Sequence, residues 1–301
     1  MKALVPFPLD ELAPLPDGLD VQVWDGLTDP PADLDDVAFY TPRYLGRRPT
    51  LELIHDLPSL QVLQVLTAGV DNLRPYLRDG MTLCNAKGLH DASTAELALA
   101  LMLASLRDLP DFVRAQDKGE WSFRFTSALA DKTVLIVGYG AVGAAIERRL
   151  DGFECNVLRV ARTRRDGIAG MDELPELLPR ADVVVLIVPM TDETRGMVDA
   201  KFLARMKDGA LLVNVARGPV VDTDALLAEL TSGRLKAVAD VTDPEPLPAD
   251  HPLWKAPGLL ISPHVGGASS AFHPRAVKLV REQLHRFAAG EPLVNVVTGA
   301  Y

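Results

Sequence analysis

The stretch TVLIVGYGAVGAAIERRL (residues 133–150) joins an apolar run, a glycine-rich turn and a helical pattern. TVLIV is typical of a buried strand, and AAIERRL is typical of a helix. The GxGxxG spacing allows a tight turn, close approach of the backbone to a pyrophosphate, and close packing of helix on strand. The stretch predicts a dinucleotide-binding unit with the phosphates at the helix N-terminus. The loop residues assigned to this site are Gly138, Tyr139, Gly140, Ala141, Val142 and Gly143.

Short apolar runs alternate with helical patterns along the whole chain, which is typical of parallel sheets with crossover helices. Six runs predict the strands of a doubly wound domain: TVLIVG (133–138), NVLRV (156–160), DVVVLIV (182–188), ALLVNV (210–215), LKAVADV (235–241) and LLISPH (259–264). Five earlier runs predict a second sheet: KALVPF (2–7), VQVW (21–24), VAFY (37–40), LQVLQVL (60–66) and TLCN (82–85). The sequence therefore predicts an α/β protein.

Two helical segments stand out by their patterns. The segment 96–109, ELALALMLASLRDL, is apolar on nearly every face, so we expect other elements to enclose it. The last helix is predicted between Pro274 and Gly290, the usual asymmetry of helix termini. Its apolar face consists of Val277, Val280, Leu284 and Phe287.

The chain of 301 residues has a formal net charge of -10 and a pI near 5.1. The overall field repels nucleic acids and anionic membranes, so we expect neither as a partner. The apolar runs are shorter than the ~18 residues of a membrane helix, and the N-terminus lacks the apolar core of a signal peptide. We therefore expect a soluble, cytoplasmic protein. We also expect no metal site, because Cys84 and Cys155 lack metal-ligand spacing.

The stretch RVARTRR (159–165) bears on the type of dinucleotide. An NAD site has an acidic residue about 20 positions beyond the glycines, where it binds the ribose 2′-hydroxyl. Ala161 takes that place, and the four residues after it can bind a 2′-phosphate, which favours NADP. The alternative is a basic surface turn beside an unusual NAD site. The four residues are Arg162, Thr163, Arg164 and Arg165, whereas Arg159 is expected to point the other way on its strand.

Arg217, Glu245 and His264 each come directly after a predicted strand of the second series. Ligands of open α/β sheets bind at the carboxyl ends of the strands, so these residues can converge. Reduction of a 2-oxo acid needs a cation for the carboxylate and a proton donor for the carbonyl oxygen, which suit an arginine and a histidine. A glutamate paired with the histidine would orient the ring and stabilise its positive charge.

Each of these residues also has a purely structural interpretation. Arg217 fits a surface ion pair, Glu245 a loop carboxylate, and His264 a histidine at a strand end. Their joint position at three strand ends favours the catalytic interpretation. His90, in NAKGLHDASTAE, is a further residue that could approach a substrate.

These motifs closely resemble the D-isomer-specific 2-hydroxyacid dehydrogenase family. The matching stretches are GYGAVG (138–143), ADVVVLIVPMTDET (181–194), LLVNVARGPVVD (211–222), VADVTDPEPLP (238–248) and ISPHVGG (261–267), with thinner matches at LTAGVDN (66–72) and STAE (93–96). The resemblance implies that Arg217 anchors the substrate, that His264 is the acid/base and that Glu245 is its carboxylate partner.

Further roles follow only from this resemblance. Asp240 matches the residue that holds the nicotinamide carboxamide, and Pro189 and Ala216 lie within motifs of the cofactor site. The backbone of Ala68, Gly69 and Val70 matches the loop that takes the substrate carboxylate, which amides can bind without a basic side chain.

The resemblance also implies two doubly wound domains with a cleft between them. A flavodoxin-like substrate domain is expected at 1–96 plus 272–301, and a Rossmann domain that binds NADP at 97–271. Members of the family are usually homodimers. Because the chain ends at Tyr301, we expect no regulatory domain like that of many phosphoglycerate dehydrogenases.

Departures from the family pattern narrow the activity. The absence of an acid at Ala161 resembles the NADPH-preferring glyoxylate and hydroxypyruvate reductases. Formate dehydrogenases have glutamine where Glu245 stands, and phosphite dehydrogenases have lysine where Ala68 stands. The leading hypothesis is NADPH-dependent reduction of small 2-oxo acids to D-2-hydroxy acids. The alternative is a dinucleotide-sensing interaction protein with little turnover, like the corepressors among the family's relatives.

Overall fold

The computed structural model describes residues 1–45, 48–71 and 73–298, so Asn72 of the motif LTAGVDN lies outside the described residues. The chain divides into two compact units, Met1–His90 with Ser270–Tyr301, and Asp91–Ser269. The expected domain boundaries, after residues 96 and 271, lie a few residues further along the chain than these divisions. The first differs because the helix α3 is continuous from Asp91, so its first turn belongs to the second unit.

The first unit contains a five-stranded parallel sheet in the order β2-β1-β3-β4-β5, which is the flavodoxin-like order. Successive residues of a strand point to opposite faces, so Ala3 and Val5 enter one hydrophobic core and Leu4 the other. Each of the five predicted strands is present. The elements are β1 (Lys2–Val5), α1 (Leu9–Leu12), β2 (Asp20–Val23), β3 (Val37–Tyr40), α2 (Arg48–Glu52), η1 (Leu53–Asp56), β4 (Val62–Gln64), η2 (Arg74–Tyr76), β5 (Thr82–Cys84) and α9 (Phe272–Ala289).

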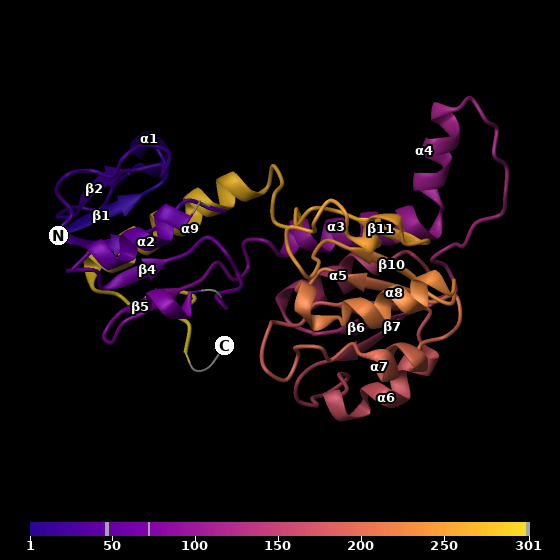
Figure 1. Ribbon diagram of the computed structural model, residues 1–301. Coiled ribbons are helices and arrows are strands. Elements are labelled where there is room, and N and C mark those ends of the chain that lie inside the picture. Colours follow the sequence, from indigo (N-terminus) through magenta and orange to yellow (C-terminus); the bar gives the residue numbers. More distant parts are fainter. Residues whose placement is uncertain (46–47, 72, 299–301) are drawn as a thin grey trace. The chain divides into compact units, whose positions relative to one another are not determined.

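The helix α9, drawn in yellow in Figure 1, is last in the sequence but lies with the strands of the first unit. Its buried residues Val277, Val280 and Leu284 pack into the core that contains Ala3. The helix ends at Gly290, whose φ of 66° is readily adopted only by glycine. The predicted apolar face and the predicted C-terminal end of this helix are confirmed, and Pro274 lies near its start, two residues after Phe272.

The second unit contains a six-stranded parallel sheet in the order β11-β10-β9-β8-β6-β7. All six predicted strands are present. In addition, Ala169 forms a one-residue parallel bridge with Val160 beside β7, where the third strand of a Rossmann sheet would lie. The elements are α3 (Asp91–Leu106), α4 (Leu109–Asp117), β6 (Thr133–Val137), α5 (Ala141–Leu150), β7 (Asn156–Val160), η3 (Met171–Glu173), α6 (Leu174–Leu177), η4 (Leu178–Arg180), β8 (Val183–Leu186), α7 (Ala200–Arg205), β9 (Leu211–Asn214), η5 (Gly218–Val220), α8 (Thr223–Thr231), β10 (Lys236–Ala239), η6 (Pro252–Lys255) and β11 (Leu259–Ile261).

Helices cover both faces of this second sheet. Met102 of α3 and Ile146 of α5 share one hydrophobic core with Val134 of β6. On the opposite face, Leu203 of α7 and Leu226 of α8 pack into the core that contains other residues of the same strands. The unit is therefore doubly wound, and the fold class predicted from the sequence is confirmed.

The apolar segment predicted as one helix over 96–109 is two helices. The first, α3, begins earlier, at Asp91, and ends at Leu106. Asp108 then has a φ of 51°, and α4 begins at Leu109 with Pro110 in its first turn. Proline lacks an amide hydrogen, so it fits the start of a helix and not its interior, and it divides the segment here. No helix in the described part of the chain is both long and apolar enough to cross a bilayer.

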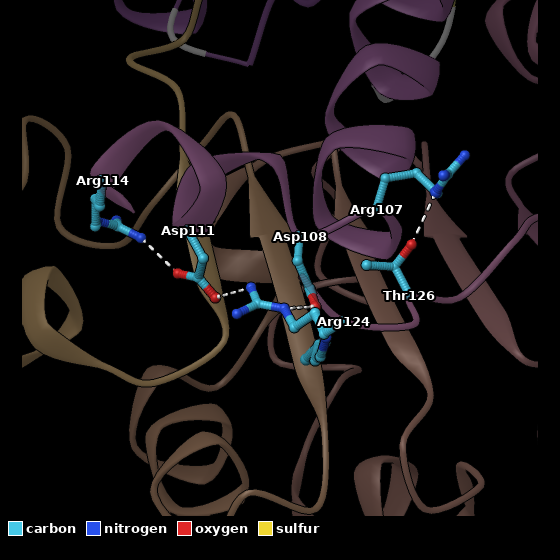
Figure 2. Close-up of polar contacts among 7 residues, drawn as sticks. Arg107, Asp108, Asp111, Arg114, Arg124 and Thr126 are labelled. Atoms are coloured by element: carbon cyan, nitrogen blue, oxygen red, sulfur yellow. Dashed lines mark hydrogen bonds and ion pairs between the residues drawn. The ribbon is translucent and has the colours of Figure 1, made fainter. Parts of the chain in front are cut away.

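We call α4 and the loop after it, residues 109–128, the arm; Figure 1 shows it extending from the second unit. Figure 2 shows how polar contacts hold the arm at its base. Arg124 pairs with Asp108 at 3.0 Å and with Asp111 at 2.9 Å, and Arg107 donates to Thr126 at 2.9 Å. The aromatic side chains of the same loop lie outside these contacts. Trp121 is 96% exposed, Phe123 79% and Phe125 96%.

Candidate active site

The glycine-rich loop leads from β6 into the N-terminus of α5. Gly138 has a φ of 106°, and a Cβ there would lie 2.4 Å from the carbonyl oxygen of Ile187. A Cβ at Gly143 would lie 2.5 Å from the carbonyl oxygen of Gly138, whereas a Cβ at Gly140 would meet nothing within 4 Å. The chain's own packing therefore requires two of the glycines. The third leaves open space beside the helix N-terminus, where a pyrophosphate fits.

Three side chains tie this loop to the adjoining strand and helix. The Tyr139 hydroxyl donates to Glu147 of α5, which also pairs with Arg159 of β7. Hydrogen bonding from the Arg159 guanidinium lowers the pKa of Glu147. Arg165 donates to the carbonyl oxygen of Tyr139 at 2.5 Å. Arg159 thus binds α5, and Arg165 links the basic segment to the glycine-rich loop.

The basic segment follows β7, the strand next to β6. Ala161 is 7% exposed, and its amide donates to the carbonyl oxygen of Ala169. Arg164 forms an ion pair with Glu173 at 2.8 Å. Within the part of the chain that the structure describes, the Arg162 guanidinium and the Thr163 hydroxyl have no hydrogen-bond partner. These two groups are therefore available to a ligand phosphate.

The loop after β8 borders the same region. Hydrogen bonding from Thr191 lowers the pKa of Glu193, and the positive charge of Arg162 contributes to the shift. The Pro189 carbonyl oxygen accepts a hydrogen bond from the Thr194 hydroxyl at 2.6 Å, which holds the first turn of this loop. Pro189 therefore belongs to an ordered strand end next to the glycine-rich loop.

Arg217 lies directly after β9, in a loop fixed by the last residue of the strand. Asn214 accepts a hydrogen bond from the Ala216 amide at 3.1 Å and donates to the Arg217 carbonyl oxygen at 3.2 Å. The Arg217 guanidinium donates to the Ala216 carbonyl oxygen at 2.7 Å. A Cβ at Gly218 would lie 1.9 Å from the Thr242 carbonyl oxygen, so only glycine lets this loop approach the loop after β10.

His264 and Glu245 form an acid–base pair in the loops that follow β11 and β10. His264 Nδ1 lies 2.6 Å from Glu245 Oε1, and the two side chains are 43% and 41% exposed. A carboxylate accepts hydrogen bonds, so the contact places a hydrogen on Nδ1 and leaves Nε2 as the nitrogen that exchanges a proton with a ligand. The arrangement suits general acid–base chemistry.

Asp240, at the end of β10, holds the loop that carries His264. Its carboxylate accepts hydrogen bonds from the Ser262 hydroxyl at 2.5 Å, the Val265 amide at 2.9 Å and the Gly266 amide at 2.8 Å. Its carbonyl oxygen accepts from the His264 amide at 2.7 Å. Asp240 is 3% exposed. The resemblance implied only a contact of Asp240 with the nicotinamide, and a single sequence carries no signal for its bonds to the His264 loop.

Arg217, Glu245 and His264 follow β9, β10 and β11, which are neighbours in the sheet. All strands of this sheet are parallel, so their carboxyl ends lie at one edge. The glycine-rich loop follows β6 at the same edge. The second unit thus places the predicted dinucleotide loop and the predicted catalytic residues along one edge of one sheet.

The remaining predicted residues, Ala68, Gly69 and Val70, belong to the first unit, in the loop after β4. The Asn85 side chain donates to the Ala68 carbonyl oxygen at 2.9 Å, and the Thr67 hydroxyl donates to the Gly69 carbonyl oxygen at 2.8 Å. In the described part of the chain, the amides of Gly69 and Val70 donate to no other residue. They are available to an anion.

His90 also belongs to the first unit and is 7% exposed. Its Nε2 lies 2.8 Å from the Leu66 carbonyl oxygen, and its ring stacks against Tyr44 and Phe272. These contacts favour a packing role for His90 in the first unit. Across the described ranges, no cluster of three or more His, Cys, Asp or Glu side chains could hold a metal ion.

A doubly wound unit with a GxGxxG loop and an acid–base pair at the same edge of the sheet defines a dinucleotide-dependent oxidoreductase. Residues 99–266 match the model of the D-isomer specific 2-hydroxyacid dehydrogenase, NAD binding domain. The chain belongs to this family and is an NAD(P)-dependent 2-hydroxyacid dehydrogenase.

Known proteins of the family align with most of the chain. The glyoxylate reductase of Korarchaeum cryptofilum is 33% identical over 82% of this chain and 78% of its own. A D-isomer specific 2-hydroxyacid dehydrogenase of Xanthobacter autotrophicus Py2, solved in complex with NADPH and MES, is 32% identical with a TM-score of 0.82 over 98% of both chains. The NADPH-dependent glyoxylate/hydroxypyruvate reductase SmGhrA of Sinorhizobium meliloti, solved with NADP and sulfate, is 27% identical with the same TM-score and coverage.

Proposed function

We propose that this protein reduces small 2-oxo acids of the glyoxylate and hydroxypyruvate type to D-2-hydroxy acids, with NADPH as the cofactor. The observation that carries the proposal is the 2.6 Å pair of His264 and Glu245, next to Arg217 in strand order. A reductase of a carbonyl flanked by a carboxylate needs these two functions, a proton donor and a cation. The activities named for the K. cryptofilum and S. meliloti relatives support the substrate class.

In this proposal His264 gives the proton on Nε2 to the carbonyl oxygen of the substrate. Glu245 accepts from Nδ1, keeps the ring oriented and stabilises the imidazolium before transfer. Arg217 binds the substrate carboxylate and polarises the carbonyl. NADPH, when bound, supplies the hydride. Asp240 keeps the His264 loop in place and contacts the nicotinamide end of the site.

In this proposal the amides of Gly69 and Val70 bind the carboxylate of a 2-oxo acid. Peptide N–H groups in a turn can bind an anion without a cationic side chain. The loop therefore does not require a basic side chain at the position of Ala68. A small 2-oxo acid presents the required carboxylate and carbonyl on adjacent carbons.

The preference for NADPH rests on the basic segment after β7. A carboxylate at position 161 would repel a 2′-phosphate, and Ala161 has none. Arg162 and Thr163 bind this phosphate in our proposal, with Arg164 or Arg165 contributing. The NADPH and NADP named with the X. autotrophicus and S. meliloti structures agree with this assignment.

The test is a panel of 2-oxo acids, led by glyoxylate and hydroxypyruvate, assayed with NADPH and NADH in parallel. We expect kcat/KM with NADPH to exceed that with NADH by about 10- to 100-fold, the size expected of one or two charged hydrogen bonds. Absence of turnover with every 2-oxo acid would refute the activity, and equal kcat/KM with both cofactors would refute the preference. Chiral analysis of the product tests the D configuration.

We further propose that the protein acts as a homodimer in which the arm contacts the second copy. Monomeric proteins seldom expose several aromatic side chains together, and Trp121, Phe123 and Phe125 lie within five residues. The ion pairs of Arg124 hold the base of the arm, so little ordering is needed when a partner binds.

A further inference from the structure

Five consecutive carbonyl groups in the loop after β4, residues 66–70, all accept hydrogen bonds from the first unit. The donors are His90 Nε2 to Leu66, the Ala86 amide to Thr67, Asn85 Nδ2 to Ala68, the Thr67 hydroxyl to Gly69, and the Leu73 amide to Val70, at 2.8 to 3.0 Å. Carbonyl and amide of one peptide group point in opposite directions. The bonds therefore fix the direction in which the loop's amides point.

One of these donors determines the Gly69 amide. The carbonyl oxygen of Ala68 and the amide of Gly69 belong to the same peptide plane. Because Asn85 Nδ2 holds that oxygen at 2.9 Å, the plane cannot rotate without losing the bond. The Gly69 amide, which donates to no other residue in the described part of the chain, stays turned away from Asn85.

Asn85 is itself held at every polar atom. Its Oδ1 accepts from the Lys87 amide at 3.1 Å, which leaves Nδ2 as the atom facing Ala68. The backbone amide of Asn85 donates to the Asn295 carbonyl oxygen at 3.0 Å, and its backbone carbonyl oxygen accepts from Gln64 Nε2 at 3.2 Å. The residue is 7% exposed. Its side chain therefore has one orientation available.

A buried amide network extends this support to the C-terminal segment. Gln64 on β4 and Gln283 on α9 are both fully buried, and Gln283 Nε2 donates to Gln64 Oε1 at 2.6 Å. Gln283 also binds both backbone groups of Val294 at 3.0 Å. Buried polar groups need partners. The bond from Gln283 to Gln64 joins α9 to the strand that precedes residues 66–70, and the bonds to Val294 join the C-terminal segment to α9.

We propose that Asn85 is a positioning residue for the substrate carboxylate, which it orients by fixing the Ala68–Gly69 peptide plane. The proposal rests on the proposed function only in that the ligand of this loop is the carboxylate of a 2-oxo acid. Asn85 does not touch the substrate in this scheme. It sets the direction of the Gly69 amide, which binds the substrate carboxylate.

Asn85→Asp is the sharpest test, because it keeps the acceptor for the Lys87 amide and replaces only the donor to Ala68 by a carboxylate oxygen. We expect KM for glyoxylate to rise about tenfold or more, while kcat changes less than about threefold and the Kd of NADPH is unchanged. Asn85→Ala should raise KM in the same direction. In hydrogen exchange, amides of residues 66–71 should exchange faster in both variants relative to peptides of β1.

Tyr40→Phe is the matched control, since it also deletes one buried side-chain bond to the backbone of the same unit, from Tyr40 to Thr50, and leaves the loop donors intact. It should leave KM and loop exchange as in the wild type. Unchanged loop exchange and KM in both Asn85 variants would overturn the proposal, as would an equal rise of KM in Tyr40→Phe. If the wild type reduces no 2-oxo acid, the proposed function fails, and loop exchange alone decides the role of Asn85.

Discussion

His264 is held from two sides, by Glu245 at its ring and by Asp240 at its backbone. Its φ of 53° is unfavourable for a residue with a side chain, by roughly 1–2 kcal/mol. The Asp240 hydrogen bonds to Val265 and Gly266 offset this energy and keep the loop in one conformation. The backbone conformation of the proposed general acid is thus held by a buried carboxylate that need not take part in proton transfer.

His264→Ala should lower kcat by about 100- to 10,000-fold, because it removes the proton donor. The Kd of NADPH, measured by fluorescence titration, should change little. His285→Ala is the control, since this half-buried histidine lies in the first unit and binds the Pro14 carbonyl oxygen. If His264→Ala retained wild-type kcat, His264 would not be the acid.

The double variant Ala161→Asp with Arg162→Ala should shift cofactor preference toward NADH. The new carboxylate binds a ribose hydroxyl and repels a 2′-phosphate, and the lost guanidinium removes a charged hydrogen bond, each worth about tenfold. The ratio of kcat/KM with NADPH to that with NADH should therefore fall by about 100-fold. An unchanged ratio would leave the basic segment as a surface turn.

At the scale of elements, the candidate site residues of the second unit follow the ends of strands. Glycines determine how closely a loop or helix approaches the neighbouring backbone. Gly218 brings the Arg217 loop against the backbone after β10, and Gly143 brings α5 against the glycine-rich loop. Gly140 differs, because the space beside it is open to a ligand and not filled by the chain. The same residue type therefore has a packing role at two places and a binding role at the third.

Gly218→Ala and Gly140→Ala should separate these two roles. The first adds a Cβ that meets the Thr242 carbonyl oxygen, so it should destabilise the fold by about 1–3 kcal/mol and lower Tm. The second should leave Tm near the wild-type value and raise the Kd of NADPH, because its Cβ enters the pyrophosphate space. The reverse result in thermal melts and cofactor titrations would contradict the assignment.

At the scale of the whole molecule, two parallel-sheet units divide the proposed work. The second unit carries the proposed dinucleotide loop and the acid–base pair, and the first carries the proposed carboxylate loop. The chain enters the second unit at Asp91 and returns to the first at Ser270, so α9 packs on the sheet of the first unit.

Trp121→Ser combined with Phe125→Ser should weaken the proposed dimer. Both side chains are 96% exposed, and aromatic anchors at an interface are often worth about 2 kcal/mol or more each. The dimer Kd should rise at least about 100-fold, as measured by light scattering across a dilution series. Leu27→Ser, an exposed apolar residue of the first unit, should leave it unchanged. A monomeric wild type would refute the dimer.

Local patterns predicted the elements well, because strand and helix periodicity follow from which residues become buried. The strands of both sheets and α9 lie where the apolar runs placed them. The division at Asp108 was missed although Pro110 signals a helix start, since an unbroken apolar pattern outweighed it. The support of Asn85 and Asp240 was missed because each bond joins residues from different strands.

By itself, the sequence determined the α/β class, the dinucleotide loop and the three strand-end residues Arg217, Glu245 and His264. These are properties of residue type and local spacing, which burial and turn geometry translate directly into structure. Only the tertiary structure decided that Glu245 and His264 are 2.6 Å apart, that Asp240 holds the His264 loop, and that Asn85 donates a hydrogen bond to the Ala68 carbonyl oxygen. Those facts depend on how parallel strands align at their carboxyl ends, and hydrogen bonds between separate strands leave no periodic trace in one sequence.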